Sequence, residues 1–366
     1  MKVKLTDVVE NIFAGGDVPK YRFSKVATDE YKIPIYANAE KDNGLYGYTD
    51  VARVSVPCVT VAARGTIGFT AKRTEPFLPV VRLITVIPNE DKITLDYLYY
   101  ALRKCRPKSS GTSIPQLTVP DIKNYSFEIT SISKQEDITQ ILDKVEYLIE
   151  IQRKRMDCYD RLIKARFMEM FGDININDKN WETQPLGELC TVVRGGSPRP
   201  IEHFLGGDVP WIKIGDATDG DSIFLNSTKE HIIQKGVKKS RLVKAGSLIF
   251  ANCGVSLGFA RIITFDGCIH DGWLAMEDID ERIDKVFLLQ TLNQMTEHFR
   301  AIAPAGTQPN LNTTIMKAYK QIIPPIELQQ EFTEFCKQID KSKFAVQKAL
   351  DKTQLLFDSL MQKYFG

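Results

Sequence analysis

The chain contains the same structural unit twice. Residues 117–172 align with residues 311–366 at a constant offset of 194 positions, without a gap, and 12 of the 56 aligned positions are identical. Just upstream, GTSIPQL at residues 111–117 corresponds to GTQPNL at residues 306–311, which is one residue shorter. Because the features recur in the same order in both halves, the sequence predicts a tandem repeat in which each half ends in the same element.

Each half is predicted to begin with a mixed globular domain. Short runs rich in β-branched and aromatic residues end at Gly, Pro, Asn or Asp, which is typical of strands joined by tight turns; they are VPCVTVAAR, FLPVVRLITVI, DVPWIKIGD and GSLIFANCG. Residues 94–104 and 285–302 carry apolar side chains at the i, i+3, i+4 spacing of amphipathic helices. The fold class is therefore α/β (α+β), repeated in tandem.

Each half is predicted to end in a long helix. The expected order is a first globular domain, a first helix, a linker with the second domain, and a second helix, at residues 1–132, 133–172, 173–326 and 327–366. Apolar side chains follow the three-and-four spacing of a coiled-coil seam; they include Ile138, Ile141, Leu142, Val145, Leu148, Ile149, Leu162, Ile163 and Phe167 in the first helix and Phe332, Phe335, Ile339, Val346, Leu350, Leu356, Phe357 and Phe365 in the second.

These helices are too long to be covered by one small domain. A helix of about 38 residues extends roughly 57 Å at 1.5 Å per residue. We therefore expect the two helices to pack antiparallel against each other and to hold the globular domains apart. The alternatives are that each helix folds back on its own domain or pairs with another chain.

Composition sets limits on the function. Seven scattered cysteines without a C-x-x-C pair and four histidines without close spacing favour reduced thiols in the cytoplasm over a disulfide framework or a zinc site. Apolar runs are too short to span a bilayer, and the first residues do not resemble a secretion signal. The net charge is only +2, with +4 on residues 1–172 (26 basic, 22 acidic) and −2 on the remainder (22 basic, 24 acidic), so a DNA-binding face needs locally concentrated charge.

Several catalytic patterns do not occur in the sequence. No G-x-x-x-x-G-K-[ST] loop for ATP is present, and neither is the Asn/Asp-Pro-Pro-Tyr segment of an amino-methyltransferase. Pro120-Asp121 and Glu128 resemble part of a nuclease motif, but Thr130 stands where that motif needs lysine. His270-Asp271 has no accompanying nucleophile pattern, so a hydrogen-bonded loop histidine is expected there. The sequence therefore contains no catalytic constellation of residues.

Two tandem domains, each followed by a heptad helix, resemble the specificity (S) subunit of type I restriction–modification systems. The second half carries the clearer motifs. LGELCTVVRGGSPRP is similar to the family's opening segment, with Ser197 where Thr is commoner; VPWIKIGDA, VKAGSLIFANCGVSLGFARI and IIPPIELQQEF are similar to its later segments. The first half departs from the family pattern, since IFAGGDVPKYRF contains Gly15 and Gly16 but no G-G-T-P. The resemblance covers nearly the whole chain.

The resemblance implies a non-catalytic DNA-binding subunit that itself binds no cofactor or metal. Each globular part would be a target-recognition domain for one part of a split, asymmetric double-stranded DNA site. The helices would set the unread spacer and dock two modification (methyltransferase) subunits. Those partners would bind S-adenosylmethionine, and ATP-dependent, Mg-requiring restriction subunits would complete the assembly. Helices of roughly 57 Å can place two readers at least one DNA turn apart, a turn being roughly 34–36 Å.

Candidate DNA contacts are basic and aromatic residues in loops and at strand ends. Arginine suits guanine or phosphate, and lysine suits phosphate. The candidates are Lys20, Tyr21, Arg22, Lys25, Arg64, Lys72 and Arg73 in the first half, and Arg194, Ser197, Arg199, Lys213, Lys238, Lys239 and Arg241 in the second. Each is weighed against an ordinary solvated surface. Trp211 is expected in the core, and the Gly-Thr segments at residues 111–112 and 306–307, with Gln116, Gln308 and Asn310, are expected to be structural turns.

Two rival functions remain at this point. The chain could be the recognition fragment of a fused restriction–methyltransferase, which the missing catalytic motifs disfavour. It could also be a scaffold whose helices join partners without any recognition of DNA sequence.

Overall fold

The computed structural model describes residues 1–104, 116–218, 223–254, 256–304 and 310–366. The chain forms two compact units, and each long helix contributes to both. Unit 1 comprises Met1–Ile151 and Leu350–Gly366, and unit 2 comprises Gln152–Ala349. The long helices are α3 (Ile132–Phe171) and α9 (Ile326–Phe365), within one residue of the expected bounds.

Unit 1 is built on a four-stranded antiparallel sheet. Its order is β2-β8-β5-β6, formed by Val9–Ala14, Ile84–Pro88, Cys58–Val61 and Thr70–Arg73. A smaller sheet has the order β4-β3-β7, formed by Leu45–Thr49, Ile33–Tyr36 and Leu78–Pro79. β1 (Lys2–Lys4) pairs with β9 (Ser126–Glu128), and the helical segments are η1 (Leu5–Asp7), η2 (Lys41–Gly44), α1 (Leu95–Lys104) and α2 (Val119–Lys123).

Unit 2 repeats this framework with a larger second sheet. Its main sheet has the order β11-β19-β16-β17-β13, formed by Thr191–Arg194, Trp273–Glu277, Leu248–Ala251, Ala260–Ile263 and Phe224–Leu225. The second sheet has the order β14-β12-β18-β15, formed by Glu230–Ile232, Leu205–Ile212, Gly267–Ile269 and Arg241–Val243. β10 (Thr183–Pro185) pairs with β20 (Lys320–Ile322), as β1 does with β9. Each of the four strand runs expected from the sequence contains a strand, but the run at residues 77–87 forms two, β7 and β8, with a turn between them.

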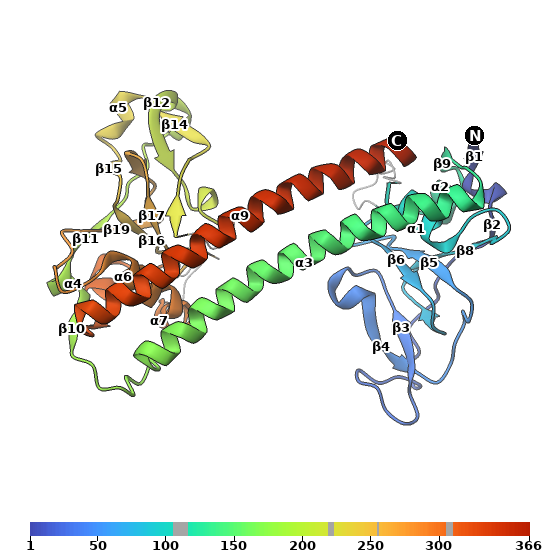
Figure 1. The fold of residues 1–366 in the computed structure, drawn as a ribbon, viewed down its shortest axis with the longest axis horizontal. Helices are drawn as coiled ribbons and strands as arrows, with labels where there is room; N and C mark the ends of the chain where they lie inside the picture. The colour runs from blue at the N-terminus through green and yellow to red at the C-terminus, as the bar shows by residue number, and fades with distance from the viewer. Residues whose placement is uncertain (105–115, 219–222, 255, 305–309) are drawn as a thin grey trace. The chain divides into compact units, whose positions relative to one another are not determined.

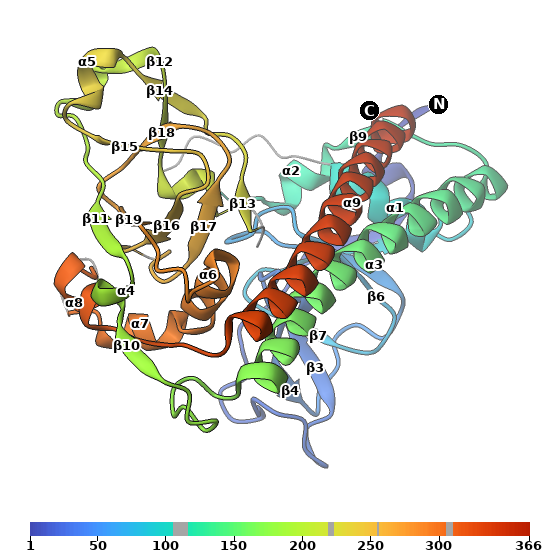
Figure 2. The ribbon, with the colours of Figure 1, turned by 60° about the vertical axis from the view of Figure 1, so that its left-hand side comes forward.

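The helices of unit 2 follow the same plan. They are α4 (Leu186–Leu189), η3 (Ile201–His203), η4 (Ile214–Asp216), α5 (Gln234–Val237), α6 (Lys285–Gln294), α7 (Thr296–Ile302) and α8 (Thr313–Ala318). α6 packs against β17 (Figure 2) and corresponds to α1 of unit 1. The single helix expected at residues 285–302 is wrong. Met295 (φ −90°, ψ 10°) interrupts it, and Thr296 Oγ1 turns toward the Gly258 carbonyl, to which it donates at 2.5 Å.

The long helices pair antiparallel within each unit. In unit 1 the first part of α3 lies beside the last part of α9 (Figure 1), and their shared buried cluster contains Leu142, Val145, Ile149, Phe357, Met361 and Phe365. In unit 2 the last part of α3 meets the first part of α9, and the shared cluster contains Ile163, Phe167, Met170, Phe171, Phe332, Cys336 and Ile339. The expected intramolecular pairing is confirmed.

The helices also pack on the globular cores, and the end of α9 does so on the domain of the first half of the repeat and not on its own. Tyr97 of α1 and Phe365 of α9, for example, have ring centroids 4.7 Å apart. The buried face of each helix packs on both the other helix and the domain, and it is narrower than the predicted seam. Four members of that seam are largely exposed, namely Ile141 (43%), Leu148 (50%), Leu162 (44%) and Leu356 (50%). None of the helices in the described part of the chain combines the length and apolar character that a membrane crossing requires.

A fully buried glutamine joins the start of each long helix to its domain. The amide nitrogen donates to two backbone carbonyls, and the amide oxygen accepts the backbone N–H of the residue that precedes α1 or α6. For Gln135 these partners are Lys92, Thr130 and Thr94, each at 2.9 Å. For Gln329 they are Arg282 at 2.9 Å, Pro324 at 2.7 Å and Asp284 at 2.9 Å. These two aligned, identical glutamines therefore form equivalent hydrogen bonds in both units.

Replacing either glutamine should destabilise the fold. Gln329→Ala leaves one backbone N–H and two carbonyls buried without partners, which we expect to lower the free energy of unfolding by about 2–4 kcal/mol. Gln135→Ala should act equally in unit 1. The matched control is Gln338→Ala, on an exposed position of α9, with an expected change within about 0.5 kcal/mol. Denaturant titration measures all three, and equal effects of Gln329→Ala and Gln338→Ala would contradict the prediction.

Candidate nucleic-acid interface

The arginine-rich loop of unit 2 follows β11 and lies directly on the turn between β18 and β19. Gly195 donates its backbone N–H to the Trp273 carbonyl at 2.9 Å, and Gly196 donates to the Ile269 carbonyl at 3.0 Å. A Cβ atom on Gly195 would lie 2.2 Å from the His270 carbonyl oxygen. Only glycine allows this approach, so the two glycines of the motif set the position of the residues that follow them.

Asp271 in that turn collects the polar side chains of the loop. Its carboxylate accepts a hydrogen bond from Ser197 Oγ at 2.9 Å and lies 3.8 Å from Arg199 Nη2. Its backbone carbonyl accepts from Arg194 Nε at 3.0 Å. Arg241 on β15 in turn donates to the Arg194 carbonyl at 3.2 Å. Four of the residues picked out from the sequence thus form one cluster, and Arg199 remains 72% exposed at its edge.

His270 is a hydrogen-bonded loop histidine, as expected. Its Nδ1 accepts the Gly272 backbone N–H at 2.9 Å, and its Nε2 lies 2.9 Å from the Asp271 carboxylate. Burial lowers the pKa of His270 below its ordinary value, and Arg199, Lys213 and Arg194 lower it further, while Asp271 raises it. The imidazole is therefore neutral near pH 7, with Nε2–H donating to Asp271.

The remaining candidates of unit 2 have separate surroundings. Lys213 forms an ion pair with Glu230, and Trp211 is buried, which confirms its expected place in the core. Lys239 Nζ lies 4.9 Å from the centre of the Phe204 ring, and Lys238 is exposed. These lysines add positive charge to unit 2, and their contact with DNA stays a prediction.

The candidates of unit 1 do not gather in one cluster. Lys20 is exposed and Tyr21 is 91% exposed on the loop between β2 and β3. Arg22 forms an ion pair with Asp50, and Lys25 Nζ lies 3.9 Å from the centre of the Tyr46 ring. Arg64 donates to Gln116 at 2.8 Å, and Lys72 pairs with Asp96 at 2.7 Å.

Arg73 differs from the expectation. Its side chain points into unit 1 and is only 4% exposed. The guanidinium lies 3.5 Å from the centre of the Tyr36 ring and donates to the Asn43 carbonyl at 2.7 Å and to Thr60 Oγ1 at 3.2 Å. Burial is the leading cause that lowers the pKa of Arg73. In this fold Arg73 is a core residue, because β6 directs alternate side chains inward.

The Gly-Thr segments, with residues 111–112, 306–307 and Gln308, lie outside the described residues. The positions that follow them are held alike in both units. Leu117 donates its backbone N–H to Ala63 at 2.9 Å, and Leu311 donates to Asn252 at 2.8 Å. Gln116 and Asn310 accept hydrogen bonds from Arg64 and Asn252. This recurrence favours the structural role that the sequence predicted for Gln116 and Asn310.

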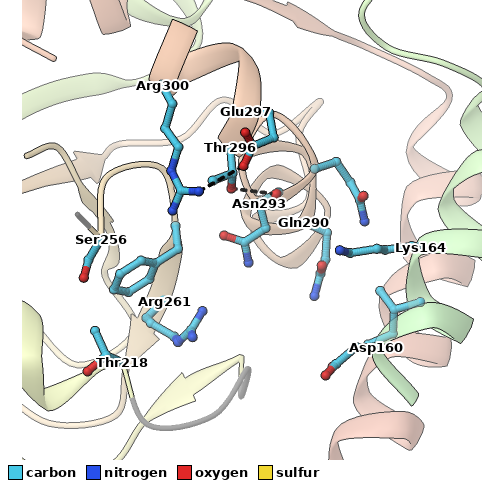
Figure 3. Close-up of a pocket in the computed structure, with 13 residues that line it drawn as sticks. Asp160, Lys164, Thr218, Ser256, Arg261, Gln290, Asn293, Thr296, Glu297 and Arg300 are labelled. Atoms are coloured by element: carbon cyan, nitrogen blue, oxygen red, sulfur yellow. Dashed lines mark hydrogen bonds and ion pairs between the residues drawn. The ribbon is translucent and has the colours of Figure 1, made fainter. Parts of the chain in front are cut away.

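Unit 2 also has a polar cleft of about 460 Å³ between α3, α6 and α7 (Figure 3). Its charged residues are largely compensated, since Arg300 pairs with Glu297 at 2.9 Å and Asp160 accepts from the buried Lys343 at 2.5 Å. The repeat explains why the cleft exists. Gln290 and Asn293 line it where unit 1 has Tyr100 and Arg103, larger side chains that approach Phe357 of α9, the counterpart of the cleft residue Ile163.

The described residues contain no group of three or more His, Cys, Asp or Glu side chains arranged to hold a metal ion. Six cysteines in the same ranges are free thiols. Asp271 is the residue that sequence reasoning missed as an organiser of the site. The sequence signal for Asp271 was its place next to His270, a pair that suggests general-base chemistry more readily than the anchoring of a loop.

The chain resembles known proteins over most of its length. The family model described as "Type I restriction modification DNA specificity domain" matches residues 1–157 and 178–354. A putative type I specificity subunit, S.MpnORF89P of Mycoplasma pneumoniae, is 33% identical over 171 residues, which are 44% of this chain and 50% of that protein. The chain thus spans about half the length of this relative.

Two further comparisons extend over nearly the whole chain. The MjaIX specificity subunit of Methanocaldococcus jannaschii is 22% identical over 95% of this chain and 86% of its own length. The crystal structure of a type I restriction–modification S subunit from M. genitalium has a TM-score of 0.63 at 16% identity and covers 100% of this chain and 96% of that one. This structural likeness establishes a common fold.

The electrostatics of the cluster can be tested through His270. Because its folded-state pKa is lowered, its contribution to stability is complete above the unfolded-state pKa of about 6.5 and is lost as the pH falls through the folded-state value. NMR titration should therefore give a midpoint below 6.5. Asp271→Asn removes the charge that raises the pKa and should lower the midpoint further, whereas the control Asp266→Asn, at the Lys244 ion pair, should not. A higher midpoint in Asp271→Asn would contradict the geometry.

Proposed function

We propose, for a chain that belongs to the family of type I restriction modification DNA specificity domains, that it is the DNA-specificity subunit of a type I restriction–modification complex. Each unit binds one part of a bipartite double-stranded DNA target. The paired helices set the distance between the two parts and dock two methyltransferase subunits. The chain itself works without catalysis or cofactor in the cytoplasm, while S-adenosylmethionine, ATP and Mg act in the methyltransferase and restriction subunits.

The observation that carries the proposal is a common framework with two different surfaces. Both units share the strand pair at the start, the main sheet, the helix on it and the glycine pair after the second strand. They differ in the segment between that glycine pair and β5 or β16, which supplies two strands of the three-stranded sheet in unit 1 (β3 and β4) and three strands of the four-stranded sheet in unit 2 (β12, β14 and β15). Two such surfaces suit two different half-sites, so the target need not be palindromic.

Local charge supports DNA as the ligand of unit 2 despite the low net charge. Arg194 and Arg199 lie beside the turn between β18 and β19, to which glycines bring the backbone close, and Arg241 donates to the Arg194 carbonyl. An exposed guanidinium on an anchored loop suits bidentate contact with guanine or phosphate. Asp271 offsets part of this charge and holds the loop, so we assign it an anchoring role.

The helix surfaces support docking of two equivalent partners. Leu162 of α3 in unit 2 and Leu356 of α9 in unit 1 occupy aligned positions, and both are exposed, at 44% and 50%. Further exposed apolar residues accompany them, namely Ile141, Tyr147 and Leu148 in unit 1 and Met168 and Phe344 in unit 2. Exposed apolar residues on a helix surface suit packing against partner helices.

Selection from random double-stranded DNA tests the proposal. We expect the chain, with a cognate modification subunit, to enrich a motif of two fixed parts separated by an unread spacer. Methylome sequencing of cells that express both should show adenine methylation at the same motif. The isolated chain should transfer no methyl group from S-adenosylmethionine, and transfer would favour the fused-enzyme alternative. Absence of any split motif with and without the modification subunit would leave only the scaffold alternative.

The loop arginines should affect one half-site alone. We expect Arg199→Ala or Arg194→Ala to reduce discrimination in the half-site of unit 2 by about tenfold and to leave the other half-site unchanged. The matched control is Lys244→Ala, which removes an exposed cation of the same unit that already pairs with Asp266. Selection profiles measure both halves at once, and an equal loss in both half-sites would contradict independent recognition.

A further inference from the structure

A strained turn in unit 1 joins β7 to β8. The Leu83 backbone N–H donates to the Val80 carbonyl at 3.0 Å, which closes a turn with Val81 and Arg82 at its centre. Val81 has φ 52° and Arg82 has φ 64°. Two successive residues with positive φ form the kind of turn that favours Asn-Gly, and a β-branched residue is rarely found there. The turn therefore carries backbone strain that a glycine at either central position would remove.

The surrounding backbone holds this turn in place. The Val81 N–H donates to the Gly16 carbonyl at 2.7 Å, and Asn38 Nδ2 donates to the Val81 carbonyl. Asn38 Oδ1 accepts the Ala63 N–H at 2.8 Å, so the same side chain ties the turn to the residue before Arg64. Gly16 and Asn38 thus hold the turn from two sides, so its strained backbone conformation is fixed.

The repeat identifies the counterpart of this turn in unit 2. Gly15 donates to the Leu83 carbonyl at 2.8 Å and Gly16 to the Pro79 carbonyl at 3.2 Å, as Gly195 and Gly196 do to Trp273 and Ile269. The turn of residues 80–83 therefore corresponds to the turn of residues 270–273, which the Trp273 N–H closes on the His270 carbonyl at 3.0 Å. In unit 2 the candidate arginines gather on this turn. In unit 1 the turn itself carries the arginine.

The tip of the turn is open to solvent. Arg82 is exposed and forms no ion pair with any residue in the described ranges, in contrast to Arg22, which pairs with Asp50. Val81 beside it is 44% exposed. A guanidinium that projects from a rigid turn can form paired hydrogen bonds to the major-groove edge of guanine, and an exposed apolar group beside it can contact a thymine methyl.

We propose that Arg82 reads a base edge in the half-site bound by unit 1. The inference rests on the proposed DNA-binding function and adds a residue that the sequence motifs did not indicate. Reading is favoured over phosphate contact because the turn is anchored on both sides, and base recognition needs a precisely placed side chain. The unfavourable backbone conformation is then retained for its placement of Arg82.

Random-site selection with the full chain and its modification subunit tests this inference. Arg82→Gly should remove preference at one position of the unit 1 half-site by about tenfold, with the unit 2 half-site unchanged. Arg82→Lys keeps the charge but lacks the paired donors, so it should lose nearly as much preference. The control Lys4→Ala removes an exposed cation from β1 of the same unit and should keep the wild-type profile.

Thermal unfolding gives an independent readout. Because glycine accepts positive φ without strain, Arg82→Gly should raise the melting temperature by about 1–5 °C while it removes base preference. A lower melting temperature would overturn the strain argument. If the wild-type chain enriches a split motif and Arg82→Gly enriches the same motif, or all sequences weaken equally, base reading by Arg82 is wrong. If the wild-type chain itself enriches no motif, it is the proposed function that fails.

Discussion

Each globular unit depends on the far end of the long helix that belongs to the other half of the repeat. The core of unit 1 is completed by Phe357 and Phe365 of α9, and the core of unit 2 by Phe167 and Phe171 of α3. Burial of a phenylalanine side chain contributes about 1.5–3 kcal/mol, so these contacts are a substantial part of a domain's net stability. Each half of the repeat therefore relies on the helix of the other half to complete its core, and the antiparallel pairing of the helices is a condition of the fold.

Because each core includes the helix of the other half, the parts of the repeat that build these cores are alike. The strand pair at the start, the main sheet and the helix on it share a buried cluster with the long helices, and the buried glutamine lies on the long helix itself. A change there disturbs a core shared by both halves. The segments after Gly16 and Gly196 lie beyond the glycine pair and build sheets of different size. The architecture thus confines variation to the surfaces proposed to meet DNA.

The sequence predicted the repeat, the long helices, their pairing and the main strands, because these follow from periodicity and composition. It could not separate the helix seam from the outer face, since Leu162 and Ile163 are both apolar and only the second is buried. It also placed Arg73 on the surface, because the side-chain direction of a four-residue strand depends on its pairing with β5. The organiser of the unit 2 loop, Asp271, and the strained Arg82 were missed because both depend on contacts between residues more than 60 positions apart.

The two units reach a similar arrangement by different chemistry at the same turn. In unit 2 Asp271 on the turn accepts a hydrogen bond from Ser197 and lies near Arg199, so an acidic and a basic side chain lie together beside the anchored loop. In unit 1 the corresponding glycines, Gly15 and Gly16, contact a turn that contains an arginine itself, and Asn38 holds this turn. The exposed cation is placed by side-chain contacts in one case and by backbone conformation in the other. A scaffold that fixes the turn but not its residues can therefore change its recognition surface without changing the core on which both helices depend.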